Sequence, residues 1–163
     1  MNHSRKVGLD IGSPQEFFRT KLKEAASITK ISLREWTEYY LVDLLWRRVQ
    51  ILPIDTPLAI QLKEIVESDD PKVKLDLYRA LGDSALVLLG MFYPIVKARS
   101  VSPSYIKDMG RGAYRAAISI GADSFQVAYS DLFYRFDSFT TLLGMFKKLS
   151  SDDFQVVTKG SDK

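Results

Sequence analysis

Residues 125–146 read FQVAYSDLFYRFDSFTTLLGMF and carry the clearest helical pattern in the chain. Apolar residues recur there at alternating intervals of four and three, at Phe125, Tyr129, Leu132, Phe136, Phe139, Leu143 and Phe146. That spacing places them along one side of an α-helix. We expect this side to face the core of the protein's own bundle. The alternative is a partner seam, formed by Phe125, Tyr129, Phe136, Phe139 and Phe146.

Residues typical of helix N-termini occur at several positions in the rest of the chain. Four prolines each follow a capping residue, at Ser13-Pro14, Thr56-Pro57, Asp70-Pro71 and Ser102-Pro103. Two capping boxes, Ser13 with Glu16 and Ser32 with Glu35, add to these signals. No segment shows sustained strand alternation. We therefore predict an all-α, single-domain bundle of about six helices, at 14–29, 33–51, 57–67, 71–92, 103–120 and 123–149.

The predicted helices define three parts of the chain. We expect a flexible N-terminus at 1–12, the bundle domain at 13–149 and a polar, flexible tail at 150–163. Residues 1–10 contain no apolar segment, which argues against a signal peptide. The longest uncharged run, 84–96, has 13 residues and is too short to span a bilayer. We expect no membrane span.

Composition excludes several kinds of chemistry. The 163 residues contain no cysteine, so disulfides, thiolate metal sites and a cysteine nucleophile are excluded, and a reducing cytoplasm is the expected compartment. The one histidine, His3, argues against histidine-based zinc sites, a Ser-His-Asp triad and a globin-like haem ligand. The sequence indicates no catalytic residue, no metal site and no cofactor.

The helices at 71–92 and 103–120 hold the residues of a candidate ligand pocket. Tyrosines lie there near an arginine, an aspartate and several glycines, and the predicted lining is Tyr78, Arg79, Asp83, Tyr105 and Tyr114. Gly82-Asp83-Ser84 also resembles the signature of GDS-type esterases. No histidine follows that segment, and it lies within a helical pattern, so we expect Gly82 to serve helix packing instead.

Two further rows share the helix at 103–120. Lys107, Arg111 and Arg115 recur every four residues and form a candidate anion patch for RNA, a phosphate ligand or an acidic protein surface. The alternative is an ordinary solvated helix face. Small residues at 110, 113 and 117 predict close approach of another helix. In the helix at 33–51, we expect Asp43 to pair with Arg47 or Arg48.

The segment 83–92 is echoed at 137–146. The two match at seven of ten positions, including the shared Leu-Leu-Gly-Met-Phe ending. A duplicated helical unit explains the match, and so does coincidence between two amphipathic helices. If the unit is duplicated, the helices at 71–92 and 123–149 are expected to occupy related positions in the bundle.

Three stretches together resemble a pattern in uncharacterised bacterial proteins. They are 39–45 (YYLVDLL), 77–92, with its LYRALGDSAL start and GMF end, and 105–114 (YIKDMGRGAY). The resemblance covers about half the chain. It implies a bacterial, cytoplasmic origin and no assigned activity.

These features favour a non-enzymatic helical interaction or adaptor module that binds a protein partner or a second copy of itself. The first alternative is a small-molecule binding domain, with a lipid-like or aromatic ligand between the helices at 71–92, 103–120 and 123–149. The second alternative is anion or RNA binding through the basic row, although no RNA-binding motif accompanies it.

Overall fold

Side-chain caps begin three of the helices where the sequence predicts them. The computed structural model describes residues 13–49, 58–98, 101–121 and 124–161. Ser13 accepts a hydrogen bond from the backbone N–H of Glu16, Asp70 from Lys72, and Ser102 from Ser104 and Tyr105. Thr56-Pro57 lies outside the described residues. Gly121, with φ 74°, ends the 103–120 helix as predicted, and its N–H donates to Ala117 O.

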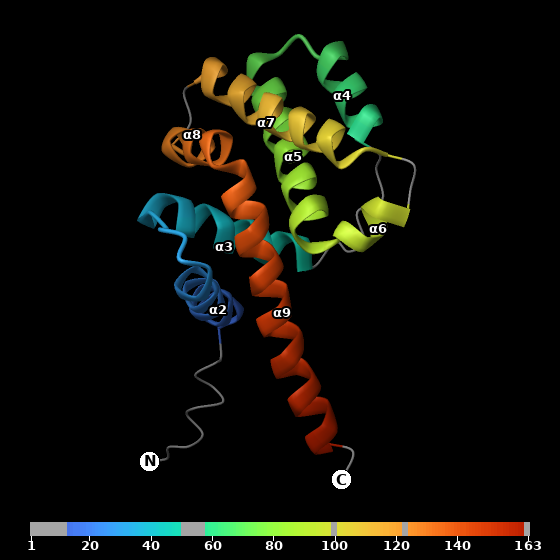
Figure 1. Ribbon diagram of the computed structural model, residues 1–163. Coiled ribbons are helices and arrows are strands. Elements are labelled where there is room, and N and C mark those ends of the chain that lie inside the picture. The colour runs from blue at the N-terminus through green and yellow to red at the C-terminus, as the bar shows by residue number, and fades with distance from the viewer. Residues whose placement is uncertain (1–12, 50–57, 99–100, 122–123, 162–163) are drawn as a thin grey trace.

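The described residues form helices and no strand, so the predicted all-α class is confirmed. These ranges contain eight helices, and the predicted count of about six was wrong. In chain order they are α2 (Pro14–Thr29), α3 (Glu35–Val49), α4 (Leu58–Glu67), α5 (Pro71–Met91), α6 (Tyr93–Ala98), α7 (Pro103–Ile120), α8 (Gln126–Tyr134) and α9 (Phe136–Ser161) (Figure 1).

The helix predicted at 123–149 is two helices. Arg135, with φ −121° and ψ 37°, separates α8 from α9, and the two run in different directions (Figure 1). The break lets residues on both sides of it pack on one core side chain, because the rings of Tyr129 and Phe136 lie 6.3 and 6.4 Å from that of Tyr114. The predicted end at Leu149 was also wrong, since α9 continues to Ser161.

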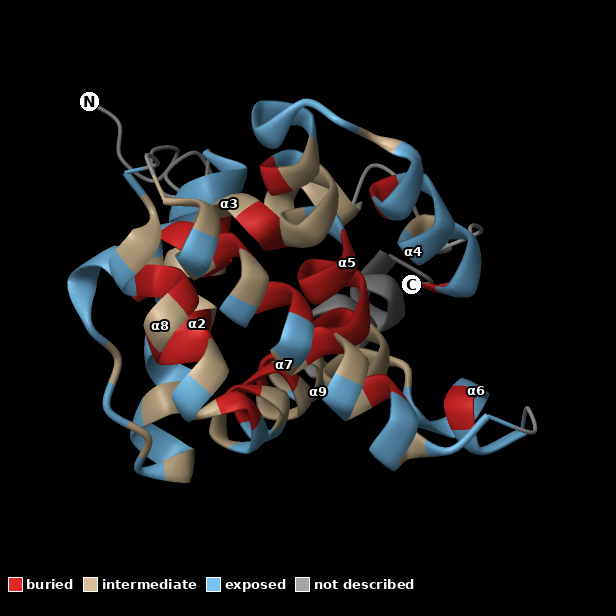
Figure 2. Ribbon diagram, turned by 90° about the horizontal axis from the view of Figure 1, so that it is seen from above, coloured by how far each residue is buried: buried red, intermediate tan, exposed pale blue. Residues whose placement is uncertain are grey.

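The apolar residues of 125–146 face the protein's own core. Phe125 is partly buried, and the other members are at most 3% exposed: Tyr129, Leu132, Phe136, Phe139, Leu143 and Phe146. Figure 2 shows the buried residues gathered where α3, α5, α7 and α9 meet. Of the predicted partner seam, folding covers Tyr129, Phe136, Phe139 and Phe146 and partly covers Phe125, so these side chains form part of the protein's own core.

Helix α3 is less buried than its apolar composition suggests. Tyr40, Leu41, Leu44 and Leu45 are buried. Trp36 and Tyr39, on the other side of the helix, are each 54% exposed. Helix α3 therefore has one core side and one aromatic outer side.

Helices α5 and α7 cross at two glycines, as the small-residue row predicts. A Cβ on Gly110 would lie 2.6 Å from the Cβ of Ala85 and 3.0 Å from the ring of Phe136. A Cβ on Gly82 would lie 2.7 Å from the ring of Tyr114. The two backbones approach so closely that a side chain at either glycine displaces core groups.

We expect Gly110→Val to lower the free energy of unfolding by about 1–3 kcal/mol, because the added carbons overpack the crossing of α5 and α7. Gly112 is the matched control: it is exposed on the same helix, and no neighbouring atom lies within 4 Å of an added Cβ. Gly112→Ala is expected to raise the free energy of unfolding by about 0.5–1 kcal/mol through helix propensity. Urea denaturation measures both, and equal effects would contradict the described packing.

The echoed segments 83–92 and 137–146 lie in α5 and α9, which pack against each other. Their corresponding glycines meet at the contact. A Cβ on Gly90 would lie 2.9 Å from the Cβ of Leu143, and a Cβ on Gly144 would lie 3.3 Å from Gly90 O. The two segments thus use the same glycine position for one shared contact, and their common ancestry stays a prediction.

Candidate functional site

A fully buried carboxylate, Asp83 of α5, lies between two tyrosines. Tyr40 of α3 donates its hydroxyl to Asp83 Oδ1 at 2.6 Å, and Tyr114 of α7 donates to the same oxygen at 2.7 Å. The pKa of both tyrosines is raised well above the usual value of 10.0, first by burial and then by the Asp83 charge. Both hydroxyls therefore stay protonated and act as donors.

Two arginines approach this group from the outer side. Arg47 Nη2 lies 3.5 Å from Asp83 Oδ2, and Arg47 Nε donates to Asp43 Oδ2 at 3.0 Å. Arg79 Nε donates to Tyr40 Oη at 3.3 Å, and the guanidinium lies over the rings of Tyr40 and Phe125, 5.1 and 5.0 Å from their centres. Burial lowers the pKa of Arg79, but Tyr40 and Asp83 raise it by more, so the guanidinium stays charged.

A hollow of about 300 Å³ opens beside these groups, between α3 and α5. We call it the α3/α5 cavity; its lining is Asp43, Arg47, Asp76, Arg79, Ala80 and Asp83. Asp43 pairs with Arg47, as the sequence predicts, at the half-exposed edge of this hollow.

The structure brings together three of the five residues predicted for the ligand pocket. Arg79, Asp83 and Tyr114 belong to the cluster around the buried carboxylate. Tyr105 is 51% exposed and Tyr78 half-buried, and neither lines the α3/α5 cavity. The predicted place, between the helices at 71–92, 103–120 and 123–149, is also corrected, since the crossing there is closely packed and the cavity lies against α3.

Sequence reasoning missed Tyr40, although it is one of the two hydroxyl donors to Asp83. Tyr39 and Tyr40 are adjacent and of one residue type, so only the helical phase of α3 separates them. That phase points Tyr40 to the core and leaves Tyr39 largely exposed.

The predicted anion patch of Lys107, Arg111 and Arg115 is largely engaged within the protein. Lys107 Nζ pairs with Asp137 Oδ2 at 2.7 Å. Arg111 donates to Phe133 O at 3.0 Å and lies over the Phe133 ring. Arg115 is exposed, and its contact with a described residue is a cation–π approach to Phe133 at 5.9 Å.

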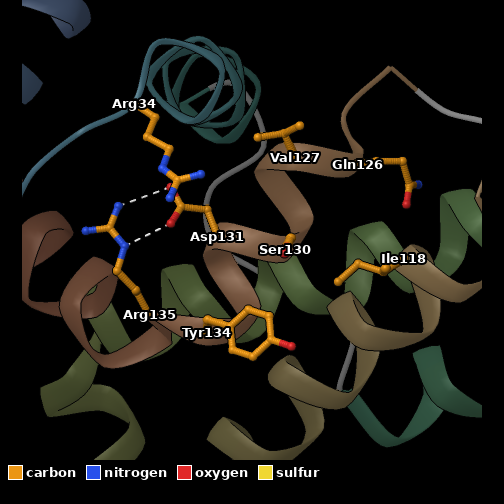
Figure 3. A pocket seen from close by; sticks show the side chains of 8 residues that line it. All are labelled: Arg34, Ile118, Gln126, Val127, Ser130, Asp131, Tyr134 and Arg135. Carbon is orange, nitrogen blue, oxygen red and sulfur yellow. Dashed lines mark hydrogen bonds and ion pairs between the residues drawn. The ribbon is translucent and has the colours of Figure 1, made fainter.

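A second hollow runs along α7 and α8, next to the residues that precede α3. One part, of about 610 Å³, is drawn in Figure 3, and an adjoining part of about 330 Å³ shares Ile118, Ser130 and Tyr134 with it. We call the two together the α7/α8 groove. Its lining is Arg34, Arg115, Ile118, Ser119, Gln126, Val127, Ser130, Asp131, Phe133, Tyr134 and Arg135.

Asp131 is held at one end of this groove. Arg135 donates two hydrogen bonds to Asp131, from Nε to Oδ1 at 2.8 Å and from Nη2 to Oδ2 at 3.1 Å. Thr37 donates a third, to Oδ2 at 2.8 Å. Figure 3 shows the side chains of both Arg34 and Arg135 reaching toward the carboxylate, with the contacts from Arg135 drawn as dashed lines. Arg135 also donates to Ser32 O at 3.0 Å, which ties the segment just before α3 to the junction of α8 and α9.

The ionisation of Asp131 makes the free energy of unfolding depend on pH. Burial raises its pKa, but hydrogen bonds from Arg135 and Thr37 and the charges of Arg135 and Arg34 lower it by more, so it ends below 3.8. A depressed folded-state pKa stabilises the fold above the unfolded-state pKa, and that stability is lost as pH falls through the folded-state value. We expect Asp131→Asn to lower the free energy of unfolding by about 1.5–3 kcal/mol at neutral pH.

The difference between Asp131→Asn and the parent protein should shrink as pH falls through the lowered pKa of Asp131, because the parent carboxylate is then itself protonated. Urea denaturation at a series of pH values measures this difference. Asp137→Asn, at an exposed carboxylate, is the control. A penalty for Asp131→Asn that is constant across the acid range would contradict the described charge contacts.

Comparison with known proteins adds no relative: no protein family, no curated protein and no solved structure matches this chain. The resemblance to uncharacterised bacterial proteins therefore stays a prediction. None of the described helices combines the length and apolar composition that crossing a membrane requires. Within the same ranges, no group of three or more His, Cys, Asp or Glu residues is arranged to hold a metal ion.

Proposed function

We propose that this chain is a helical interaction module that binds an acidic, amphipathic segment of a protein partner in the α7/α8 groove. One observation carries the proposal: the groove places two exposed arginines beside exposed apolar side chains. Arg34 lies beside Asp131, and its charge helps to lower the pKa of that carboxyl. Neither Arg34 nor Arg115 makes an ion pair or hydrogen bond with a described residue. Tyr134 is 75% exposed and Val127 48% exposed in the same hollow.

Charge selects the kind of partner. The groove contains three arginines, Arg34, Arg115 and Arg135, against one carboxylate, Asp131. Arg135 and Asp131 neutralise each other through their paired contacts. The groove is left with two positive charges, and complementary negative charge on a partner favours both encounter and correct orientation.

The apolar lining selects an amphipathic segment. Ile118, Val127, Phe133 and Tyr134 offer carbon surface on the walls. Covering them returns water to the bulk, at roughly 25 cal/mol for each Å² of apolar area. Tyrosine and arginine are also the side chains that most often dominate the energy of protein interfaces.

A second copy of the chain fits the groove less well than an acidic partner. In a twofold dimer the same surface meets itself, so the arginines of one copy would face a surface with the same excess of positive charge. Like charges brought together in an interface oppose association. RNA is also less favoured, since Lys107 and Arg111 of the basic row are occupied by Asp137 and Phe133.

Nuclear magnetic resonance titration with defined probes tests the proposal. The probes are a synthetic amphipathic helix of leucine and glutamate, the same helix with lysine for glutamate, and a single-stranded RNA. We expect the glutamate peptide alone to shift the backbone amides of Arg34, Ile118, Val127 and Tyr134. Its binding should weaken as salt is raised, because the charges involved are exposed.

Charge reversal supplies the matched control. Arg34→Glu with Arg115→Glu is expected to abolish the shifts. Lys63→Glu with Lys72→Glu makes the same change in net charge at exposed sites outside the groove and should preserve them. Equal binding of both peptides, shifts outside the groove, or binding of the RNA alone would overturn the proposal.

A further inference from the structure

The α3/α5 cavity is lined by a buried polar pair whose hydrogen-bonding capacity the described residues do not fill. Asp83 Oδ2 and Arg47 Nη2 are both buried, and neither has a hydrogen-bond partner among the described residues. Their contact is with each other, an ion pair at 3.5 Å. Leaving buried charged atoms without hydrogen bonds is costly, and such groups are concentrated at functional sites.

Two neighbouring carboxylate oxygens are already occupied. Asp83 Oδ1 accepts from both Tyr40 and Tyr114. Asp43 Oδ2 is shared by Arg47 at 3.0 Å and Arg79 at 3.6 Å. The buried atoms left without hydrogen bonds are therefore one carboxylate oxygen, which can accept, and one guanidinium nitrogen, which can donate, and they lie side by side.

Asp76 adds a negative charge at the rim. It lies on α5 one turn from Ala80, is exposed, and makes no ion pair with a described residue. With Asp43, Arg47, Arg79 and Asp83 it gives the cavity three carboxylates and two guanidiniums. A ligand that brings a cationic donor next to an anionic acceptor complements this arrangement.

We propose that the α3/α5 cavity binds a free α-amino acid. Its ammonium group donates to Asp83 Oδ2 and faces the Asp76 charge, while its carboxylate accepts from Arg47 Nη2. In an α-amino acid these two groups are attached to one carbon, which matches the close spacing of Asp83 Oδ2 and Arg47 Nη2. A volume of about 300 Å³ lies at the lower limit of ligand pockets and suits one small molecule.

The buried tyrosines hold the recognition group in place. Tyr40 and Tyr114 fix the Asp83 carboxylate through Oδ1, which leaves Oδ2 directed away from them. The Asp83 carboxylate is therefore held in position before a ligand arrives. This cavity shares no lining residue with the α7/α8 groove, so the two proposals succeed or fail separately.

Isothermal titration calorimetry of the full chain tests the inference. The probes are the twenty common amino acids, each screened with its decarboxylated amine and its deaminated acid. We expect at least one amino acid to bind about tenfold or more tightly than either fragment, because each fragment leaves one buried partner unsatisfied. Arg47→Gln should weaken that binding by about tenfold, and Asp76→Asn by a smaller factor.

Asp83→Asn should abolish the calorimetric signal. If that variant does not fold, Arg47→Gln and Asp76→Asn test the inference instead, because both side chains reach solvent and their replacement should leave the protein folded. Asp108→Asn, an exposed carboxylate on α7 outside the cavity, is the matched control and should bind as the parent does. No binding by any amino acid, equal binding of the amine fragment, or binding unaffected by Arg47→Gln would overturn the inference.

Discussion

Replacing Phe139 with alanine is expected to lower the free energy of unfolding by about 3–5 kcal/mol, the usual cost of emptying a buried aromatic site. Phe139 is fully buried in the core that includes α9. Its ring also lies 4.8 Å from the Arg135 guanidinium, which forms the ion pair with Asp131. Chemical denaturation followed by circular dichroism measures the loss.

The same variant separates a core residue from a partner-seam residue. A seam residue would leave the stability of the single chain unchanged and alter only its association. Tyr134→Ala, at an exposed aromatic on the adjacent helix, is the matched control and should change the free energy of unfolding by no more than about 0.5 kcal/mol. If the two variants were equally stable, the described core would be wrong.

Asp83→Ala is the second variant with a large expected effect, a loss of about 3–5 kcal/mol in the free energy of unfolding. The substitution removes the acceptor of two buried hydroxyls, those of Tyr40 and Tyr114. It also leaves Arg47 Nη2 without its counter-charge. Buried donors without acceptors are destabilising, and so is a buried guanidinium nitrogen that has lost its counter-charge.

Asp76→Ala is the control for Asp83→Ala, since it removes an exposed carboxylate from the same helix and the same cavity. It should change the free energy of unfolding little. Tyr114→Phe provides a graded comparison, because it removes one of the two donors and keeps the ring. An Asp83→Ala protein as stable as Asp76→Ala would show that the tyrosine–carboxylate cluster does not hold the three helices together.

Local signals in the sequence predicted much of the fold. Capping residues and prolines act over a few residues, so the starts of α2, α5 and α7 could be read directly at Ser13, Asp70 and Ser102. The small residues of α7 likewise predicted its close contact with another helix. The pairing of Asp43 with Arg47 followed from their spacing of one helical turn.

The break at Arg135 could not be read in this way. The heptad-like spacing continues through it, so the pattern of 125–146 looks like one helix. The contacts that hold the junction, from Arg135 to Ser32 and from Asp131 to Thr37, join residues about a hundred positions apart. Nothing in the neighbouring sequence distinguishes Arg135 from the other arginines of the chain.

The candidate sites were predictable only in part for the same reason. Arg79 and Asp83 share a helix, and their spacing placed them together. Their partners Tyr40 and Arg47 come from α3, and that meeting depends on tertiary packing. In the α7/α8 groove, Arg34 lies with Arg115, although the two are far apart in sequence. The other members of the basic row, Lys107 and Arg111, contact Asp137 and Phe133 instead.

Photo-crosslinking from the groove tests the proposed function most directly. A benzophenone side chain replaces Tyr134, and the protein is irradiated in a lysate of its source cells. The proposal predicts a discrete protein adduct whose crosslinked segment, identified by mass spectrometry, is acidic. The adduct should disappear with Arg34→Glu and Arg115→Glu and persist with Lys63→Glu and Lys72→Glu. An adduct that survives the groove reversal, or that joins RNA, a basic segment or a second copy of the chain, would contradict it.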